Sequence, residues 1–195
     1  MTAELVVIGG SWGGFEAVCL LLRRLPPDPA PPMVIVLHRS QKSAHGALEA
    51  MVRDCSRAPV VPVEDKEPLR PGCLYLAPPD YHLLIEDGSL ALSTDDLVQF
   101  SRPSIDVLFE SAADQYGEGL VGVLLTGANA DGAAGIRRIK LRGGTTMAQD
   151  PATAVRPEMP QAAIDTGMVD VVADIEGLAA RLGELVVLSA PGARS

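Results

Sequence analysis

The beginning of the chain is the feature that most limits how it can fold. A β-rich apolar run, Leu5–Ile8, ends at the glycine pair Gly9 and Gly10. After Ser11, apolar residues recur at helical spacing as far as Arg24. This order predicts a buried strand, a tight glycine turn and a helix, which together form the first half of a βαβ unit.

The same alternation continues along most of the chain. A proline-rich stretch precedes a second apolar strand, Met33–Leu37, whereas the run that begins at Val60 is too interrupted by proline to be a central strand. The other expected elements are helices at 47–52, 103–116 and 132–141, strands at 121–125, 145–148 and 169–172, and a C-terminal helix. Strands alternating with helices predict an α/β fold with a mostly parallel sheet.

The middle of the chain departs from this alternation. Apolar residues at 82–85 and 90–92 flank Asp87-Gly88, a dipeptide typical of a type I′ hairpin turn. We therefore expect an antiparallel hairpin added to the parallel sheet. Because 195 residues fit one domain better than two, residues 1–189 are expected to form a single domain and residues 190–195 a frayed tail.

Charge and hydropathy restrict the partners and the compartment. The chain carries 16 basic against 25 acidic residues, a net charge of −9, and it has no basic run. Nucleic acid and anionic membrane surfaces would be repelled, so neither is an expected partner. The first residues lack the basic region of a secretory signal, and no apolar stretch is long enough for membrane insertion. A cytoplasmic location is the expectation.

The cysteines indicate neither a disulfide framework nor a metal site. Cys19, Cys55 and Cys73 are an odd number at wide spacing, which predicts buried thiols in a reducing compartment. The histidines also lack the close pairing typical of zinc ligands. We therefore expect no metal and no cofactor.

Three chemically reactive residues follow predicted strands. Ser11 lies in the glycine turn after the first strand, His38 ends the second, and Asp131 lies in the glycine-rich loop after the strand predicted at 121–125. The carboxyl ends of parallel strands share one edge of a sheet, and sites form there. These three side chains are therefore expected to converge.

The turn around Ser11 allows two interpretations. Gly9 to Gly13 fits G-x-S-x-G, in which glycines permit a cramped turn that exposes a nucleophilic serine, but glycine-rich turns also bind phosphate. A dinucleotide fingerprint would need glycine at Ser11 and an acidic residue near His38. A phosphate-binding Gly-Lys-Ser/Thr sequence is also missing. Both nucleotide interpretations are weakened.

His38 and Asp131 also have plain structural interpretations. A single histidine is more often structural than catalytic, and Asp131 could cap the helix that follows it. Their placement instead suggests that His38 accepts the Ser11 proton while Asp131 orients the imidazole. The order Ser, His, Asp differs from that of ordinary α/β-hydrolases. His45 and His82 stand in no recognisable motif.

Several ordered motifs resemble the catalytic domain of the CheB-type chemotaxis protein-glutamate methylesterases. The likeness runs from about Leu5 to about Val172. The matching segments are VIGGSWGG at 7–14, VLH at 36–38, YLAPPDYH at 75–82, SRPSIDVLF at 101–109, LTG at 125–127, DGAAG at 131–135, AQD at 148–150 and MPQAAI at 159–164. So many matches in order make a chance likeness improbable.

The resemblance implies a serine hydrolase on a doubly wound parallel sheet. It would remove methyl groups from glutamate esters on the cytoplasmic helices of chemoreceptors and release methanol, and some relatives also deamidate receptor glutamines. The family's nucleophile, base and orienting acid fall on Ser11, His38 and Asp131. Backbone amides near Trp12 and Gly13 are the expected oxyanion donors.

The chain departs from the family pattern in the expected pocket and in its extent. Trp12 stands where a small hydroxyl residue is usual, and Ala128 where methionine is usual, so both bear on substrate choice. The family's usual form carries an N-terminal receiver domain, whereas here the likeness begins near residue 1, so the chain is expected either to stand alone or to be one part of a longer protein. Without that domain in the chain, control is expected from elsewhere, such as a separate receiver or regulatory protein. Arg102, Asp106 and Gln149 also match family positions, but structural roles explain them equally well.

Two other functions stay open at this point. One is a receptor-docking or scaffold protein that keeps the fold while Trp12 blocks the pocket. The other is an esterase for a small-molecule ester, suggested by the aromatic residue beside Ser11 and by the missing receiver domain.

Overall fold

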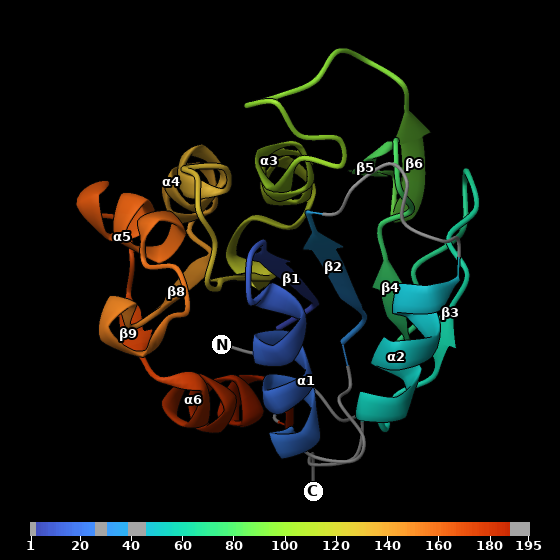
Figure 1. The fold of residues 1–195 in the computed structure, drawn as a ribbon. Helices are drawn as coiled ribbons and strands as arrows, with labels where there is room; N and C mark the ends of the chain where they lie inside the picture. Colours follow the sequence, from blue (N-terminus) through green and yellow to red (C-terminus); the bar gives the residue numbers. More distant parts are fainter. Residues whose placement is uncertain (1–2, 26–30, 39–45, 188–195) are drawn as a thin grey trace, which may run out of the picture.

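A parallel sheet of seven strands forms the centre of the molecule (Figure 1). The computed structural model describes residues 3–25, 31–38 and 46–187. The strands, in chain order, are β1 (Leu5–Gly10), β2 (Met33–Leu37), β3 (Val60–Val61), β4 (Leu74–Leu76), β7 (Leu120–Leu124), β8 (Thr145–Gln149) and β9 (Val171–Ala173). Their spatial order is β3-β4-β2-β1-β7-β8-β9, and every neighbouring pair is parallel. The predicted α/β fold is confirmed.

Helices cover both faces of the sheet. They are α1 (Gly14–Arg24), α2 (Ala47–Cys55), α3 (Ile105–Tyr116), α4 (Ala133–Leu141), α5 (Glu158–Asp165) and α6 (Ile175–Val187). The hydrophobic core on one face includes residues of α1, α2 and α6, and the core on the other face includes residues of α3, α4 and α5. The sheet is therefore doubly wound, and the chain changes side between β1 and β7.

The central strand β1 supplies side chains to both cores. Val6 and Ile8 belong to the core under α1, whereas Leu5 and Val7 belong to the core under α3. Alternate side chains of a strand point to opposite faces, so a continuous apolar run is the pattern expected for a strand buried on both sides. This explains why the first apolar run becomes the middle of the sheet.

The antiparallel hairpin forms a second, two-stranded sheet. Strands β5 (His82–Glu86) and β6 (Ser89–Ser93) pair with each other, and β5 packs against α3. Asp87 and Gly88 have φ angles of 48° and 75°, as the predicted type I′ turn requires. The Ile85 N–H donates to Ser111 Oγ on α3 at 3.1 Å. The hairpin therefore rests on a helix and does not extend the sheet.

Most predicted elements are present, with differences at their ends. The Val60–Val61 strand lies at the sheet edge, as its prolines predict. Helix α5 was not predicted, and β9 begins two residues later than expected. The predicted frayed tail and most of the proline-rich stretch lie outside the described residues. Within the described residues, no helix is both long and apolar enough to cross a membrane.

The prediction of three free thiols is wrong. Cys19 on α1 and Cys55 at the end of α2 form a disulfide, with a Cα–Cα distance of 5.2 Å, and Cys73 is free. The two half-cystines are 36 residues apart, so their pairing depends on α1 and α2 packing together. Wide spacing in the sequence did not exclude a bond between neighbouring helices.

Candidate active site

Ser11 lies in the turn between β1 and α1, at the edge of the sheet where the strands end. Its N–H donates to Thr126 O at 2.9 Å, and its own carbonyl accepts the N–H of Gly14 at 2.7 Å. Gly13 has a φ of 77°, and a Cβ atom there would lie 2.8 Å from Val155 Cβ. Only glycine suits that position. The structure thus shows the tight strand-to-helix turn that the G-x-S-x-G pattern predicts.

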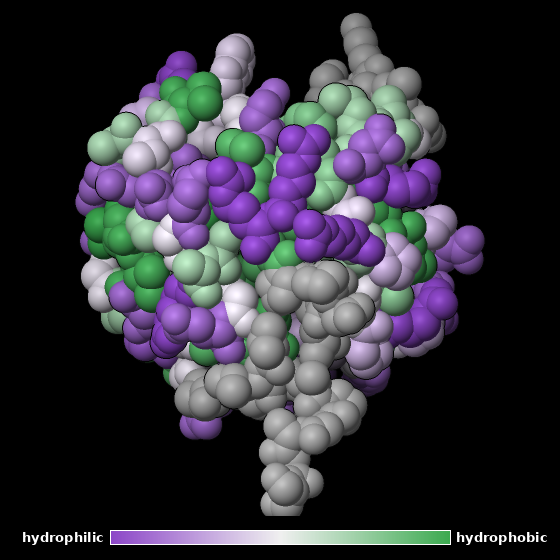
Figure 2. Space-filling model, turned by 90° about the horizontal axis from the view of Figure 1, so that it is seen from below, coloured by the Kyte–Doolittle hydropathy of each residue, from purple (hydrophilic) through white to green (hydrophobic). Residues whose placement is uncertain are grey.

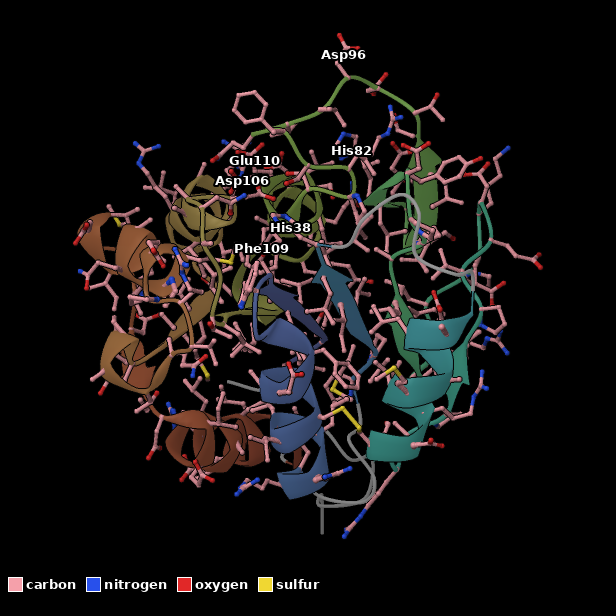
Figure 3. All side chains as sticks on the ribbon, in the orientation of Figure 1. His38, His82, Asp96, Asp106, Phe109 and Glu110 are labelled. Carbon is pink, nitrogen blue, oxygen red and sulfur yellow. A yellow bond between two sulfur atoms is a disulfide. The ribbon has the colours of Figure 1, made fainter. Side chains whose placement is uncertain are left out.

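His38 lies beside this turn, directly after β2 (Figure 3). Its N–H donates to Gly10 O at 3.1 Å, which joins the ends of β1 and β2. Its ring Nε2 lies 2.7 Å from Asp131 Oδ2, and the two side chains are 12% and 0% exposed. The histidine and the aspartate that the sequence nominated are therefore a buried, hydrogen-bonded pair.

Asp131 is surrounded by hydrogen-bond donors. Besides the bond with His38, its carboxylate accepts hydrogen bonds from Ser104 Oγ at 2.9 Å and from the N–H groups of Ile105 and Asp106 at 2.8 and 3.0 Å. These donors lie at the beginning of α3, so Asp131 caps that helix. Its structural interpretation as a cap of the following helix α4 is wrong, because Gly132, with a φ of 96°, holds the N-cap position there.

The surroundings keep Asp131 ionised. Burial, the largest single effect, tends to raise the pKa of this carboxyl, but the hydrogen bonds from His38 and from the N–H groups of Asp106 and Ile105 lower it below its usual range. An ionised carboxylate can only accept hydrogen bonds, so His38 Nε2 carries a proton and donates it in a hydrogen bond to Asp131. In the neutral imidazole, Nδ1 is then the nitrogen with the free lone pair.

A second serine lies at that nitrogen. Ser101 Oγ is 3.4 Å from His38 Nδ1, and sequence reasoning did not single out this residue. Ser11 also lies where the strands end, and a Cβ atom on Gly127 would be 2.9 Å from Ser11 Cβ. Among the hydrogen bonds of the described residues, none joins Ser11 Oγ to His38. The ring therefore contacts Asp131 and Ser101 in this structure.

Of the three residues expected in the pocket, Trp12 and Gly13 directly follow Ser11, and Ala128 follows Gly127, where an added Cβ atom would lie 2.9 Å from Ser11 Cβ. The Trp12 side chain is 67% exposed, and Ala128 is also exposed. Trp12 O accepts a hydrogen bond from Thr126 Oγ1 at 3.0 Å. Within the described residues, the N–H groups of Trp12 and Gly13 donate to no protein acceptor. The two amides predicted to bind an oxyanion are therefore available for one.

His82 holds one of the hydrogen-bond donors around Asp131, although sequence reasoning did not single it out as a site residue. It is 1% exposed, its Nδ1 accepts the Ser104 N–H at 3.2 Å, and its Nε2 donates to Asp96 O at 3.0 Å. Because Ser104 donates its hydroxyl to Asp131, His82 fixes one of the donors around the carboxylate. The family motif that ends at residue 82 was the available signal.

Asp106 and Asp131 cap each other's helices. Asp106 lies in the first turn of α3, and its Oδ1 accepts the N–H groups of Gly132 and Gly135, at 2.9 and 2.7 Å, at the beginning of α4. Its Oδ2 accepts Gln99 Nε2 at 2.9 Å. Burial, with repulsion from Asp131 adding to it, raises the pKa of Asp106 to about 6. Asp106 thus fixes the loop that carries Asp131.

We expect replacement of Asp106 by alanine to lower the free energy of unfolding by about 2–4 kcal/mol, because two buried N–H groups lose their acceptor. Asparagine keeps one acceptor oxygen and costs less. The aspartate has a higher pKa in the folded than in the unfolded chain, so its contribution to stability falls as pH rises from about 4 to about 6. Urea unfolding of wild type, Asp106→Ala and Asp106→Asn across this pH range measures both effects.

The comparison between wild type and Asp106→Asn isolates the titration of this carboxyl. Asp131 is present in both proteins, so its own titration contributes to both curves. The stability of the asparagine variant relative to wild type should increase as pH rises through the window. Parallel curves would show that the pKa of Asp106 is not raised.

Metal ligation has no obvious place in this site. In the parts of the chain that the structure describes, no group of three or more His, Cys, Asp or Glu side chains is arranged to hold a metal ion. The residues around Ser11 instead supply a hydroxyl, an imidazole–carboxylate pair and free backbone amides. A hydroxyl, an imidazole–carboxylate pair and backbone amides are the groups that a serine hydrolase uses.

The chain belongs to the CheB methylesterase family, whose model matches residues 6–182. A relative from Leptospira interrogans is 44% identical over 180 residues, which cover 92% of this chain and 93% of the relative. The Anaeromyxobacter dehalogenans protein-glutamate methylesterase/protein-glutamine glutaminase 2 is 42% identical over 93% of this chain, which spans 53% of that relative. The family predicted from the motifs is confirmed.

A solved structure supports the same conclusion. The crystal structure of the Thermotoga maritima CheB methylesterase catalytic domain is similar to this chain with a TM-score of 0.88 and 32% identity. The match covers 95% of this chain and all of that domain. The doubly wound sheet with its added hairpin is therefore the fold of a CheB catalytic domain.

Proposed function

We propose that this chain hydrolyses methyl esters of glutamate side chains on chemoreceptor helices and releases methanol. The buried His38–Asp131 pair carries the proposal, because an ionised carboxylate on Nε2 leaves Nδ1 as the base. The names of the relatives give the substrate class, and they add glutamine deamidation as a second reaction of the same acyl-transfer type.

The proposed reaction has two halves. Ser11 Oγ attacks the ester carbonyl carbon while His38 Nδ1 takes the hydroxyl proton, and the N–H groups of Trp12 and Gly13 stabilise the oxyanion. When the ester C–O bond breaks, His38 returns the proton to the leaving methoxide as methanol. Water then attacks the acyl-enzyme carbonyl while His38 Nδ1 takes one of the water protons, and His38 gives that proton to Ser11 Oγ as the bond between the acyl carbon and Ser11 breaks. The glutamate side chain leaves as the carboxylic acid, which then ionises.

Trp12 argues against a blocked pocket. Trp12 is 67% exposed, so most of its surface is in contact with solvent and is not packed against the turn that carries Ser11. This observation favours an active hydrolase over a scaffold protein with the same fold. Control by a separate receiver or regulatory protein, and a cytoplasmic location, stay predictions.

Methanol release tests the function directly. We expect the wild-type protein to release methanol from methylated chemoreceptor membranes, and ammonia from receptors that carry glutamine at the same positions. Heat-denatured protein is the control. Receptor binding without either product would support a docking protein, whereas hydrolysis of short-chain esters alone would support a small-molecule esterase.

A further inference from the structure

An exposed aromatic side chain lies near the ends of the strands that carry Ser11 and His38. Phe100 is 96% exposed, the highest value among the large exposed hydrophobic residues, and Leu97 in the same loop is 51% exposed. The loop joins β6 to α3 and extends beyond the ends of the strands, with Asp96 at its outer end (Figures 1 and 3). Exposed aromatic residues of this kind are enriched at binding surfaces.

A tight turn holds Phe100 in this position. The Val98 N–H donates to Ser101 O at 3.2 Å, and the Ser101 N–H donates to Val98 O at 2.8 Å. Between them, Gln99 and Phe100 have φ angles of 46° and 63°, in the left-handed region that bulky residues seldom adopt. The fold imposes an unfavourable backbone conformation and presents an apolar ring to water.

The rest of the loop is fastened at several points. Gln99 donates to Asp106 at 2.9 Å, and His82 donates to Asp96 O at 3.0 Å. The Arg102 guanidinium donates to Thr94 O and Asp95 O, at 2.8 and 2.9 Å, and to Asp80. Contacts on both sides of Phe100 therefore preorganise the turn, which lowers the entropy cost of binding through it.

The turn that carries Phe100 also contacts His38, the candidate base. Ser101, which follows Phe100, places its Oγ 3.4 Å from His38 Nδ1. An ester carbonyl that reaches His38 is therefore close to this turn. The Phe100 ring points into solvent, however, so only a substrate that extends well beyond its reacting group can cover it.

We propose that Phe100, together with Leu97 in the same loop, is a docking point for the apolar face of the helix that carries the esterified glutamate. Residues three or four apart on a helix lie on one face, so an apolar residue one turn from the ester comes about 5–6 Å from it. This inference rests on the proposed esterase function. It assigns recognition of the helix to the turn 98–101 and leaves the chemistry to Ser11, His38 and Asp131.

Two ester probes separate docking from chemistry. One is N-acetyl-glutamate γ-methyl ester methylamide, which has no helix; the other is an amphipathic helical peptide of about 20 residues with one γ-methyl glutamate flanked by apolar residues at i±3 and i±4. We expect Phe100→Ala to lower kcat/KM for the helical peptide about 10-fold or more, through KM. Hydrolysis of the small ester should stay within about twofold of wild type.

Matched variants test whether the effect is specific. Leu141→Ala removes a side chain that is 55% exposed at the far end of α4, and it should leave both probes unaffected. Phe100→Trp should restore most of the activity on the helical peptide, because another aromatic ring covers the same surface. Thermal unfolding of all variants shows whether the turn still folds.

Each result decides the proposal. Equal losses on both probes would show that Phe100 acts through Ser101 on His38, and no loss on either would show that the helix does not contact the turn. If the wild type hydrolyses neither probe, the esterase proposal fails, and binding of the fluorescently labelled helical peptide decides the docking proposal. Weaker binding by Phe100→Ala would then support docking, and unchanged binding would overturn it.

Discussion

Replacing Ser11 by alanine should lower kcat for ester hydrolysis by about 10⁴- to 10⁶-fold, because the acyl-enzyme can no longer form. The fold should be retained, since the contacts of residue 11 with Thr126 and Gly14 involve backbone atoms. Methanol release under single-turnover conditions measures the loss. Labelling by a serine-directed fluorophosphonate should disappear in the same variant.

Ser101→Ala is the informative companion to this experiment. Ser101 Oγ is the hydroxyl that contacts His38 Nδ1 in this structure, so it is the alternative nucleophile that geometry offers. We expect its loss to lower kcat much less than the loss of Ser11. If the Ser101 variant loses activity and labelling while the Ser11 variant keeps both, the assignment of the nucleophile is wrong.

The ends of parallel strands explain why three site residues could be nominated from the sequence. Ser11, His38 and Asp131 each follow a predicted strand, and the topology brings such positions to one edge. The structure places His38 and Asp131 in contact and Ser11 in the adjoining strand-to-helix turn. Strand assignment was enough, because the rule requires only the order of the strands and their parallel direction.

The residues that support Asp131 could not be predicted in the same way. His82 begins β5 and Ser104 is the N-cap of α3, and what they do for Asp131 depends on how the hairpin and the beginning of α3 pack beside it. Asp106 and Asp131 cap each other's helices although they are 25 residues apart in the sequence. The sequence of either helix alone does not specify such a contact. Local rules identify a cap only for the helix that follows it.

Two further features of the fold were hidden for similar reasons. Helix α5 contains Pro160 in its first turn, where proline is tolerated, but its short apolar pattern gave no periodic signal. The Cys19–Cys55 disulfide required knowledge that α1 and α2 are neighbours. Both depend on tertiary packing, which hydropathy along the chain does not record.

Asp131→Asn should lower kcat by about 10³- to 10⁴-fold while Ser11 and His38 stay in place. Where the carboxylate accepts a hydrogen bond from His38 Nε2, asparagine can present an N–H group. Nε2 would then have to accept, so the imidazole would carry its proton on Nδ1. That tautomer cannot accept the Ser11 proton. Comparison of kcat and KM should show that the loss lies in kcat.

The same variant should change the acid dependence of stability. The pKa of Asp131 is lower in the folded than in the unfolded chain, so the carboxylate stabilises the fold above its usual pKa of about 3.8, and this contribution is lost as pH falls below that value. Asp131→Asn removes the contribution, so its stability should fall less steeply in acid. Urea unfolding between about pH 2 and pH 6 measures the difference.

Asp114→Asn is the matched control for Asp131→Asn. Asp114 is a half-exposed carboxylate on α3 that pairs with Arg138 and Arg142, both on the surface. Surface pairs of this kind contribute about 0–1 kcal/mol, so activity should stay near wild type. If Asp131→Asn, folded as wild type, kept more than about a tenth of the wild-type kcat, His38 would not need Asp131 as its orienting acid. The buried pair would then serve chiefly to join β2 to the beginning of α3.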